Sequence, residues 1–359
     1  MAVNSIKLEV SEKNLINNVE YLKNKYNKKI LPVIKADAYG HGMGLVSQIF
    51  YEKGYKEFAV ARLSEAKKIL ENKKLSDCRV LIFESVGSEY FSDIEKYDSI
   101  DVTANTFSEL EELLDYGIPS ERIQIKIDFG FGRNGLKLSE IQKLKEYMST
   151  KNLKFKGIYS HLYAVEYQEG KELLEKFHNI LKFLGEENFQ MVHMQNSIGT
   201  LFYGDAPGMT HLRVGAYTYG LQEEGFFHEG LKRVFSLKGE IAGVRDIENS
   251  RYLAYNLKSE LGIEGWKNVA KIKIGYGDGF IKSNEKSNCL INGKPYKILS
   301  VTMDNTFIQV DESVKEGDEV ELYPDLSIVR ENTGMPIFEL LTLLNGRIER
   351  VPEISHDLT

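Results

Sequence analysis

The sequence predicts an α/β protein, a (β/α)8 TIM barrel followed by a C-terminal, mostly β domain. Short apolar strands alternate with amphipathic helices over roughly 220 residues, which fits eight βα units better than a smaller open sheet. Beyond about residue 225 the pattern changes to strict alternation of apolar and polar residues, with a hairpin signal. We therefore expect a barrel over residues 11–225 and a β-rich domain over 226–359, which also takes an N-terminal strand in 1–10.

The elements of the barrel follow from local patterns. A helix is expected after the N-cap residue Ser11, and the apolar strand Ile30–Ile34 ends at Lys35. Glycines at positions 40, 42 and 44 precede a helix over Gly44–Tyr51. The further strands expected here are Phe58–Val60, Arg79–Phe83, Ile123–Ile127, Phe155–Tyr159 and Gln190–His193, and the further helices are Leu63–Leu70 and Leu173–Leu184.

The C-terminal part is typical of antiparallel sheet. Ala270, Ile272 and Ile274 alternate with two lysines, as in a half-buried strand. Asn292-Gly293 is a hairpin signal between Cys289–Ile291 and Tyr296–Val301. The remaining elements expected are the strands Phe307–Val310 and Glu319–Tyr323 and one helix near Glu339–Leu344.

Composition narrows the class of function. The chain has 359 residues, of which 42% are hydrophobic and 28% charged, and its net charge of −7 argues against a nucleic-acid partner. It has no apolar run of membrane-spanning length and no signal peptide at its start, so we expect a cytoplasmic protein without a membrane partner. Cys78 and Cys289 are expected as reduced thiols, and the spacing of the seven histidines predicts no metal site.

The densest group of chemically useful residues surrounds Lys35. The segment reads Ile30-Leu-Pro-Val-Ile-Lys35-Ala-Asp-Ala-Tyr39-Gly-His-Gly42. Barrel enzymes keep catalytic groups where a strand ends, and apolar surroundings lower the pKa of a lysine. A neutral lysine amine can attack an aldehyde and form a Schiff base. On this pattern alone, a lysine that merely leaves a buried strand for solvent is the commoner interpretation.

Seven segments together resemble the alanine racemase family. The Lys35 segment resembles its cofactor-lysine motif, with Asp37 where the family usually has asparagine. The other six, in the family's order, are Lys126–Gly135, Gly157–His161, His193–Ser197, Leu212–Ala216, Ile274–Gly279 and Met303–Asp304. One such motif is weak evidence, but seven in order are strong. The resemblance implies an amino-acid racemase that depends on pyridoxal 5′-phosphate and interconverts L- and D-alanine, the latter a peptidoglycan precursor.

The resemblance also implies how the cofactor is held. Lys35 carries it as a Schiff base and acts as one of two bases, and the hydroxyl of Tyr39 binds its phosphate. Arg213 faces the pyridine nitrogen, where most pyridoxal enzymes place a carboxylate, and His193 supports that arginine. The other residues implied in cofactor binding are Asn196, Ser197, Gly215 and Ala216. Taken singly, Arg213 could equally form a surface salt bridge and His193 could be a core histidine.

Further residues are implied on the substrate side. Arg133 binds the carboxylate of the amino acid, and Tyr276 and Met303 line the pocket. Lys126 corresponds to a lysine that is often carbamylated in the family. An ordinary pair between Lys126 and Asp128 is the alternative.

The second base in the family is a tyrosine from the partner subunit's C-terminal domain. Tyr255 matches it best and Tyr252 competes, while His161 is the expected relay neighbour. An obligate head-to-tail homodimer follows from this arrangement.

Substrate choice is open in the sequence. Gly346 stands where many members of the family have a tyrosine that narrows the entrance. Another aromatic residue, Tyr276, Tyr217 or Tyr219, could equally fill this gap. We expect alanine as the best substrate, with activity on larger side chains. The alternatives are a racemase dedicated to serine, lysine or ornithine, a pyridoxal-phosphate-dependent decarboxylase, and a non-catalytic carrier of the cofactor.

Overall fold

The computed structural model describes residues 6–75, 77–163, 166–222 and 225–353. The chain divides into two compact units. The first contains Lys13–Ala38 and Val46–Arg233. The second contains Met1–Glu12, Tyr39–Leu45 and Val234–Thr359.

Eight parallel strands form a ring in the first unit, which confirms the predicted barrel. They are β2 (Lys29–Pro32), β3 (Glu57–Val60), β4 (Arg79–Ile82), β5 (Ile100–Ala104), β6 (Ile123–Lys126), β7 (Phe155–Tyr159), β8 (Phe189–His193) and β9 (His211–Val214). Strands β3 to β8 pair in sequence order, and β2 pairs with β9. A bridge between Val33 and Ala59 joins β2 to β3, and the Thr210 amide donates to the Val192 carbonyl between β9 and β8. The ring is therefore closed.

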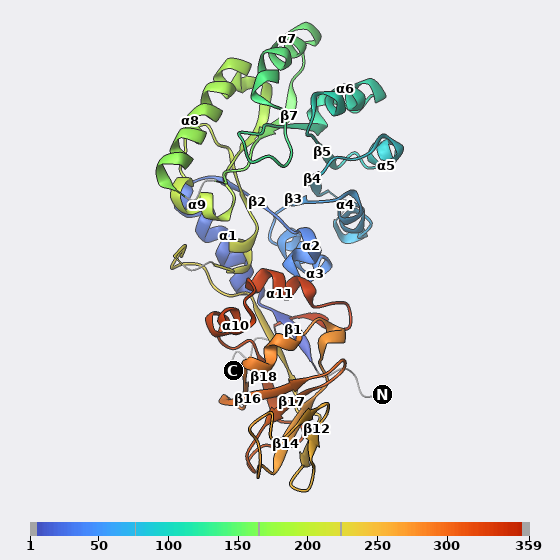
Figure 1. Ribbon diagram of the computed structural model, residues 1–359. Helices are drawn as coiled ribbons and strands as arrows, with labels where there is room; N and C mark the ends of the chain where they lie inside the picture. Colours follow the sequence, from blue (N-terminus) through green and yellow to red (C-terminus); the bar gives the residue numbers. More distant parts are fainter. Residues whose placement is uncertain (1–5, 76, 164–165, 223–224, 354–359) are drawn as a thin grey trace. The chain divides into compact units, whose positions relative to one another are not determined.

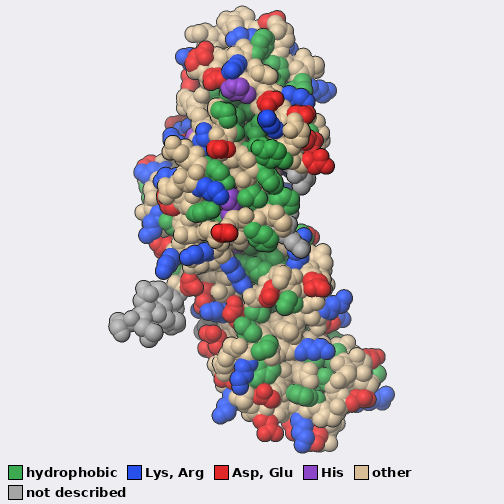
Figure 2. Space-filling model, turned by 90° about the vertical axis from the view of Figure 1, so that its left-hand side faces the viewer, with side chains coloured by type: hydrophobic (Ala, Val, Ile, Leu, Met, Phe, Trp, Pro, Cys, Tyr) green, Lys and Arg blue, Asp and Glu red, His purple; other side chains and the backbone are tan. Residues whose placement is uncertain are grey.

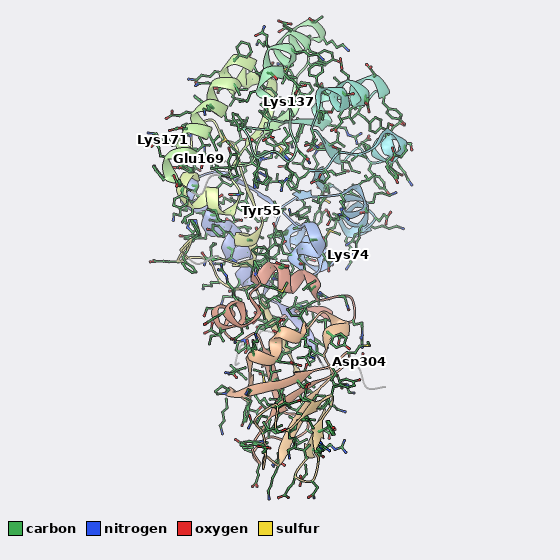
Figure 3. The ribbon with its side chains drawn as sticks, in the orientation of Figure 1. Tyr55, Lys74, Lys137, Glu169, Lys171 and Asp304 are labelled. Carbon is green, nitrogen blue, oxygen red and sulfur yellow. The ribbon has the colours of Figure 1, made fainter. Side chains whose placement is uncertain are left out.

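Helices cover the outside of this ring (Figure 1). They are α1 (Glu12–Tyr26), α3 (Met43–Glu52), α4 (Leu63–Leu70), α5 (Phe91–Lys96), α6 (Phe107–Tyr116), α7 (Ile141–Lys151), α8 (Tyr167–Leu184) and α9 (Ser197–Tyr203). Helix α8 begins six residues before the predicted Leu173, because its first turns are mostly exposed and polar and give no apolar stripe. There the exposed side chains of Glu169 and Lys171 lie on the outer side of the helix (Figure 3).

Strand β5 was not predicted from the sequence, because it carries polar residues although all five of its residues are buried. Asp101 forms an ion pair with Arg79, and the Thr103 hydroxyl donates to the Ile82 carbonyl at 2.7 Å. A buried strand tolerates polar side chains when each has a partner. The alternation of apolar and polar residues then no longer reports which face is buried.

The second unit is built on a nine-stranded sheet. Its strands, in sheet order, are β11 (Gly243–Asp246), β14 (Asn268–Ile272), β17 (Thr306–Gln309), β16 (Lys294–Val301), β15 (Asn288–Ile291), β18 (Glu319–Leu322), β10 (Phe235–Glu240), β1 (Lys7–Val10) and β19 (Glu349–Pro352). All neighbours pair antiparallel except β1 and β19. A separate short hairpin joins β12 (Tyr252–Leu253) and β13 (Asn256–Leu257).

One hairpin and one helix test the expectations for this unit. The predicted hairpin is confirmed: Asn292 and Gly293 connect β15 to β16 with φ angles of 48° and 78°. The expectation of a single helix is wrong, since α10 (Leu326–Thr333) precedes α11 (Ile337–Leu343). The sequence did not predict α10, because only Val329 of its eight residues is buried and a helix of this kind has no apolar stripe.

Charges of both signs are interspersed over the face that Figure 2 shows. The net charge of −7 is therefore not gathered into one acidic patch there. Among the described residues, no helix combines the length and the apolar character that crossing a membrane requires.

Candidate active site

The predicted site residues of the barrel gather at the carboxyl ends of its strands. Lys35 follows β2, and His161 follows β7. Lys126, His193 and Arg213 lie in the last residues of β6, β8 and β9. Since carboxyl ends of barrel strands meet at one face, residues from distant parts of the chain converge there.

Lys35 begins an unusual turn, α2 (Lys35–Tyr39). The four residues after the lysine have left-handed φ angles: 51° at Ala36, 53° at Asp37, 57° at Ala38 and 54° at Tyr39. A left-handed conformation costs roughly 1–2 kcal/mol for each residue that has a Cβ atom. Such strain is concentrated at functional sites, where the surrounding structure holds it in place. Tyr39, predicted to bind the phosphate, ends this turn and is half-buried.

Glycine is required directly after this turn, where the chain enters the second unit. Gly40 has a φ of +83°, and a Cβ atom there would lie 2.1 Å from the Leu341 carbonyl oxygen. The Arg350 guanidinium donates to the Gly40 carbonyl at 3.0 Å. Gly40 is therefore held against α11 and β19 within the second unit.

The surroundings of Lys35 favour its neutral amine. Burial lowers its pKa most, and the positive charges of Arg133 and Arg213 lower it further. The carboxylates of Glu65 and Glu84 act in the opposite direction. A larger neutral fraction makes this lysine a better nucleophile and a better base near neutral pH.

Lys126 is buried at the end of β6. Burial and the charges of Arg133 and Arg213 lower its pKa to about 8. The alternative ion pair with Asp128 is not formed in the structure, although the charge of that carboxylate raises the pKa of Lys126. That carboxylate instead accepts hydrogen bonds from the Gly130 and Gly132 amides, both at 3.0 Å, and so holds the loop after β6. Over the described ranges, Lys126 has no ion-pair partner.

A hydrogen bond joins the Arg213 guanidinium to the His161 ring. The guanidinium donates to the Ser160 carbonyl at 3.0 Å and to His161 Nδ1 at 3.2 Å. Burial and nearby cations lower the pKa of His161 to about 3, so the ring is neutral. Because an arginine only donates, Nδ1 is the acceptor in this hydrogen bond.

His193 is the last residue of β8. It is fully buried, stacks on Tyr159 at 4.7 Å between ring centroids, and has Nε2 2.9 Å from Gln124 Oε1. The Arg213 guanidinium lies 5.4 Å from the Tyr159 ring centroid. Sequence reasoning missed Gln124 and Tyr159, although both lie on predicted strands.

The predicted phosphate-binding residues lie together in the segments that follow β8 and β9. Ser197 Oγ accepts from the amides of Gly215 and Tyr217, both at 3.3 Å, and Ala216 lies between those two residues. Asn196 caps α9, with its Oδ1 accepting from the Gly199 amide at 2.7 Å. Backbone amides and a hydroxyl in a loop after a barrel strand suit a phosphate group. With the cationic Arg133 and Arg213 close enough to lower the pKa of Lys35, the residues present fit pyridoxal 5′-phosphate.

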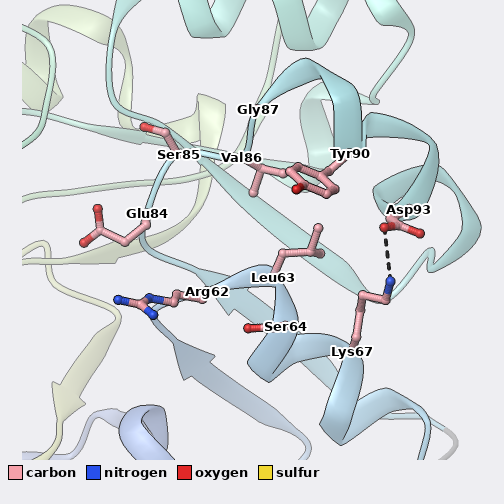
Figure 4. Close-up of a pocket in the computed structure, with 10 residues that line it drawn as sticks. All are labelled: Arg62, Leu63, Ser64, Lys67, Glu84, Ser85, Val86, Gly87, Tyr90 and Asp93. Atoms are coloured by element: carbon pink, nitrogen blue, oxygen red, sulfur yellow. Dashed lines mark hydrogen bonds and ion pairs between the residues drawn. The ribbon is translucent and has the colours of Figure 1, made fainter.

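A pocket of about 360 Å³ lies between the start of α4 and the segment after β4, and none of the residues that line it is a predicted site residue (Figure 4). Glu84 lines the pocket and also acts on the pKa of both Lys35 and Lys126. Its Oε2 accepts from Asn134 Nδ2 at 2.9 Å. Glu84 was also missed from the sequence. It directly follows the predicted strand Arg79–Phe83, and this position at a strand end could have identified it as a candidate.

The predicted residues of the second unit are exposed. Tyr255 is 86% exposed in the turn of the β12–β13 hairpin. Its neighbours are fixed, because Leu253 packs in a buried cluster and Asn256 Nδ2 donates to Ser300 Oγ at 3.0 Å. Tyr252, the competitor, is half-exposed, with the Arg251 guanidinium 5.6 Å from its ring centroid.

Tyr276 and Met303 lie next to each other in this unit. The Tyr276 amide donates to the Thr302 carbonyl at 3.0 Å, and the Gly277 amide donates to the Met303 carbonyl at 2.8 Å. Both side chains are about half exposed. The neighbouring Asp304 (Figure 3) forms an ion pair with Arg347 at 2.8 Å.

Models of two known domains match nearly the whole chain. The alanine racemase N-terminal domain matches residues 10–223, and the alanine racemase C-terminal domain matches residues 234–352. The chain belongs to the alanine racemase family. The resemblance inferred from seven sequence segments is thereby confirmed.

Individual alanine racemases are similar over their full length. The enzyme of Fusobacterium nucleatum is 29% identical, covering 96% of this chain and 98% of its own. A crystal structure of the E. faecalis enzyme superposes with a TM-score of 0.84 at 25% identity, covering 98% of this chain and all of its own. The structure from Bartonella henselae, with covalently bound pyridoxal phosphate, has a TM-score of 0.80 at 23% identity, covering 97% and 99%. Both units of this chain therefore have counterparts in the family.

Proposed function

We propose that this protein racemises alanine with pyridoxal 5′-phosphate held covalently by Lys35. One observation carries the proposal: a lysine with a lowered pKa lies among Lys126, Arg133 and Arg213 at the barrel face, in a member of the alanine racemase family. The group that the lysine would hold has an aldehyde for the amine and a phosphate for the amides around Ser197. The proposed cofactor and the residues present therefore agree in charge and chemistry.

The chain's own groups each have a task in this proposal. When bound, the cofactor withdraws electron density from Cα of the amino acid and so acidifies its proton. Arg133 pairs with the substrate carboxylate and orients Cα, and the neutral Lys35 amine takes or returns a proton on one face. Arg213 stays charged and donates toward the ring nitrogen, and His161 and the Ser160 carbonyl hold its guanidinium in place.

Inversion at Cα needs a second base on the opposite face. We assign this role to Tyr255 of a partner subunit in a head-to-tail homodimer. A tyrosine exposed on a hairpin whose neighbours are anchored suits a residue that completes a site on another chain. We also propose that the enzyme is cytoplasmic, because the two reduced thiols, Cys78 and Cys289, suit a reducing compartment.

A decarboxylase of similar architecture is less well supported. Enzymes of that kind need a cysteine from the C-terminal domain in the active site. Cys289 is fully buried in β15, and burial raises the pKa of its thiol to about 12. An inert thiol of this kind does not serve as a catalytic group.

Carbamylation of Lys126 is the first expected property of the site. At a pKa of about 8, roughly a tenth of the amine is neutral at pH 7, and it can add to CO2 with loss of a proton. The resulting anion replaces repulsion of Arg133 with attraction and orients that guanidinium for the substrate carboxylate. Removing CO2 should therefore raise the KM for alanine roughly tenfold, and added bicarbonate should reverse the change.

The carbamate can be detected directly, and one variant serves as the control. Carbon-13 NMR with labelled CO2 should show a carbamate in the wild type that grows from pH 7 to pH 9 at constant dissolved CO2. Lys126→Arg, which cannot be carbamylated, should show neither the signal nor the CO2 dependence. If the wild-type KM did not change when CO2 was removed, and no carbamate signal appeared, Lys126 would act as an ordinary ammonium group.

Gly346 is the expected determinant of side-chain size. A Cβ atom there has nothing within 4 Å, so a side chain can start from this position without a clash at its first atom. We expect alanine to have the highest kcat/KM, and the tyrosine variant to lose roughly tenfold more activity on serine, lysine and ornithine than on alanine. Steady-state constants for the four amino acids, with Gly346→Ala as control, test the substrate assignment. A uniform loss, or a substrate other than alanine in the lead, would refute this view of the pocket.

A further inference from the structure

We propose that Glu65 is a positioning residue that holds the Lys35 turn in its left-handed conformation. This inference rests on the proposed function of Lys35. Glu65 lies on α4 and was not among the residues singled out from the sequence. Its carboxylate receives three backbone N–H groups, from Ala36, Ala61 and Arg62.

The two oxygens of this carboxylate act on different parts of the barrel. Oε1 accepts from the Ala36 amide at 2.6 Å, directly after the lysine. Oε2 accepts from Ala61 at 2.8 Å and from Arg62 at 3.0 Å, at the point where β3 ends and α4 begins. Glu65 therefore ties the first peptide of the strained turn to the rigid start of a helix.

The strands beneath the turn make this tie effective. The Ile34 amide donates to the Ala59 carbonyl at 2.9 Å, so the end of β2 is already held beside β3. The Ala38 amide donates back to the Ile34 carbonyl at 3.0 Å and closes the turn. Ala36 lies between these two points, and its amide is held by the Glu65 carboxylate.

Charge gives Glu65 a second effect on the lysine. The charged groups that act on the pKa of Lys35 are Arg133 and Arg213, which lower it, and Glu65 and Glu84, which raise it. When Glu65 is neutralised, less negative charge counteracts the lowering of the Lys35 pKa by the two arginines. The ammonium form of Lys35 would then lose its proton at lower pH.

The chain offers a matched control in Glu109. Both glutamates are the third residue of a barrel helix, and each Oε2 accepts from the backbone amide four residues earlier, at 2.8 Å for Glu65 and 2.9 Å for Glu109. They differ in the other oxygen, since Glu109 Oε1 accepts from the Ser85 hydroxyl instead of the turn. Loss of a helix-cap contact is therefore common to Glu65→Gln and Glu109→Gln, whereas loss of the turn contact is not.

Amide hydrogen exchange of the full-length protein, with and without pyridoxal phosphate, tests the proposal. In Glu65→Gln a single amide oxygen cannot serve both positions, so peptides covering 35–39 should exchange on the order of tenfold faster. In the holoenzyme, kcat for alanine should fall roughly 10²-fold with little change in KM, because the lysine is displaced and Arg133 is not. Glu109→Gln should leave exchange at 35–39 and kcat close to wild type.

Unchanged exchange at 35–39 in Glu65→Gln overturns the proposal, as does equal acceleration in Glu109→Gln. If Glu65→Gln does not fold, Glu65→Asp keeps the charge but shortens the reach, and faster exchange at 35–39 supports the proposal while wild-type exchange contradicts it. Failure of the wild type to racemise alanine would refute the proposed function and leave the exchange result standing.

Discussion

Lys35→Ala is expected to abolish racemisation, lowering kcat/KM for alanine by about 10⁴-fold or more. The variant loses both the amine that would hold the cofactor and one of the two bases. Lys29→Ala, at the start of the same strand, removes a lysine that is exposed at the opposite end of β2. It should retain wild-type activity.

Chemical trapping locates the cofactor independently of activity. Borohydride reduction followed by peptide mass mapping should place the pyridoxyl group on Lys35 in the wild type and in Lys29→Ala. Recovery of the label on a different lysine, or a wild type that binds no cofactor after reconstitution, would remove the basis of the assignment.

Tyr255→Phe is expected to slow racemisation by about 10²–10⁴-fold in both directions. Both directions must fall together, because the equilibrium constant between enantiomers does not depend on the enzyme. Proton exchange at Cα of one enantiomer should persist, since Lys35 still serves its own face. Tyr252→Phe, three residues earlier on the same hairpin, should stay near wild type if Tyr255 is the base. The reverse pattern would move the role to Tyr252.

Mixed subunits show which chain supplies the tyrosine. Lys35→Ala and Tyr255→Phe are each expected to be nearly inactive alone, but a hybrid dimer of the two contains one site with both native residues if sites are shared. Random pairing of equal amounts should recover roughly a quarter of wild-type activity, because half of the dimers are hybrids with one intact site each. Absence of any recovery, with hybrids demonstrated, would place Tyr255 and Lys35 of one chain in one site.

The barrel could be predicted from the sequence because most of its strands are short apolar runs with a charged or polar residue at the end. Lys35 and Lys126 both stand at such ends, and the resemblance to the alanine racemase family, added to this position, made them candidates for the site. Strand β5 was missed because Asp101 and Thr103 are buried but paired. Partners of that kind come from other strands and leave no local pattern.

The supporting contacts of the site were the least predictable part. The bond from Arg213 to His161 joins β9 to the segment after β7, and the bond from Ala36 to Glu65 joins the Lys35 turn to α4. Left-handed φ angles at Ala36 and Ala38 contradict the preference of alanine for right-handed structure. Local propensity cannot reveal such a turn, because tertiary contacts impose it.

Conversion of L-alanine in D2O tests the central claim most directly. With the reconstituted holoenzyme, chiral separation and mass spectrometry should show the two enantiomers approaching equal amounts. The D-alanine formed should carry deuterium at Cα, because a base removes one proton and solvent-derived deuterium is returned from the other face. Release of CO2 with ethylamine would indicate a decarboxylase. Unchanged, unlabelled L-alanine in the presence of bound cofactor would indicate a carrier, and either result would contradict the account.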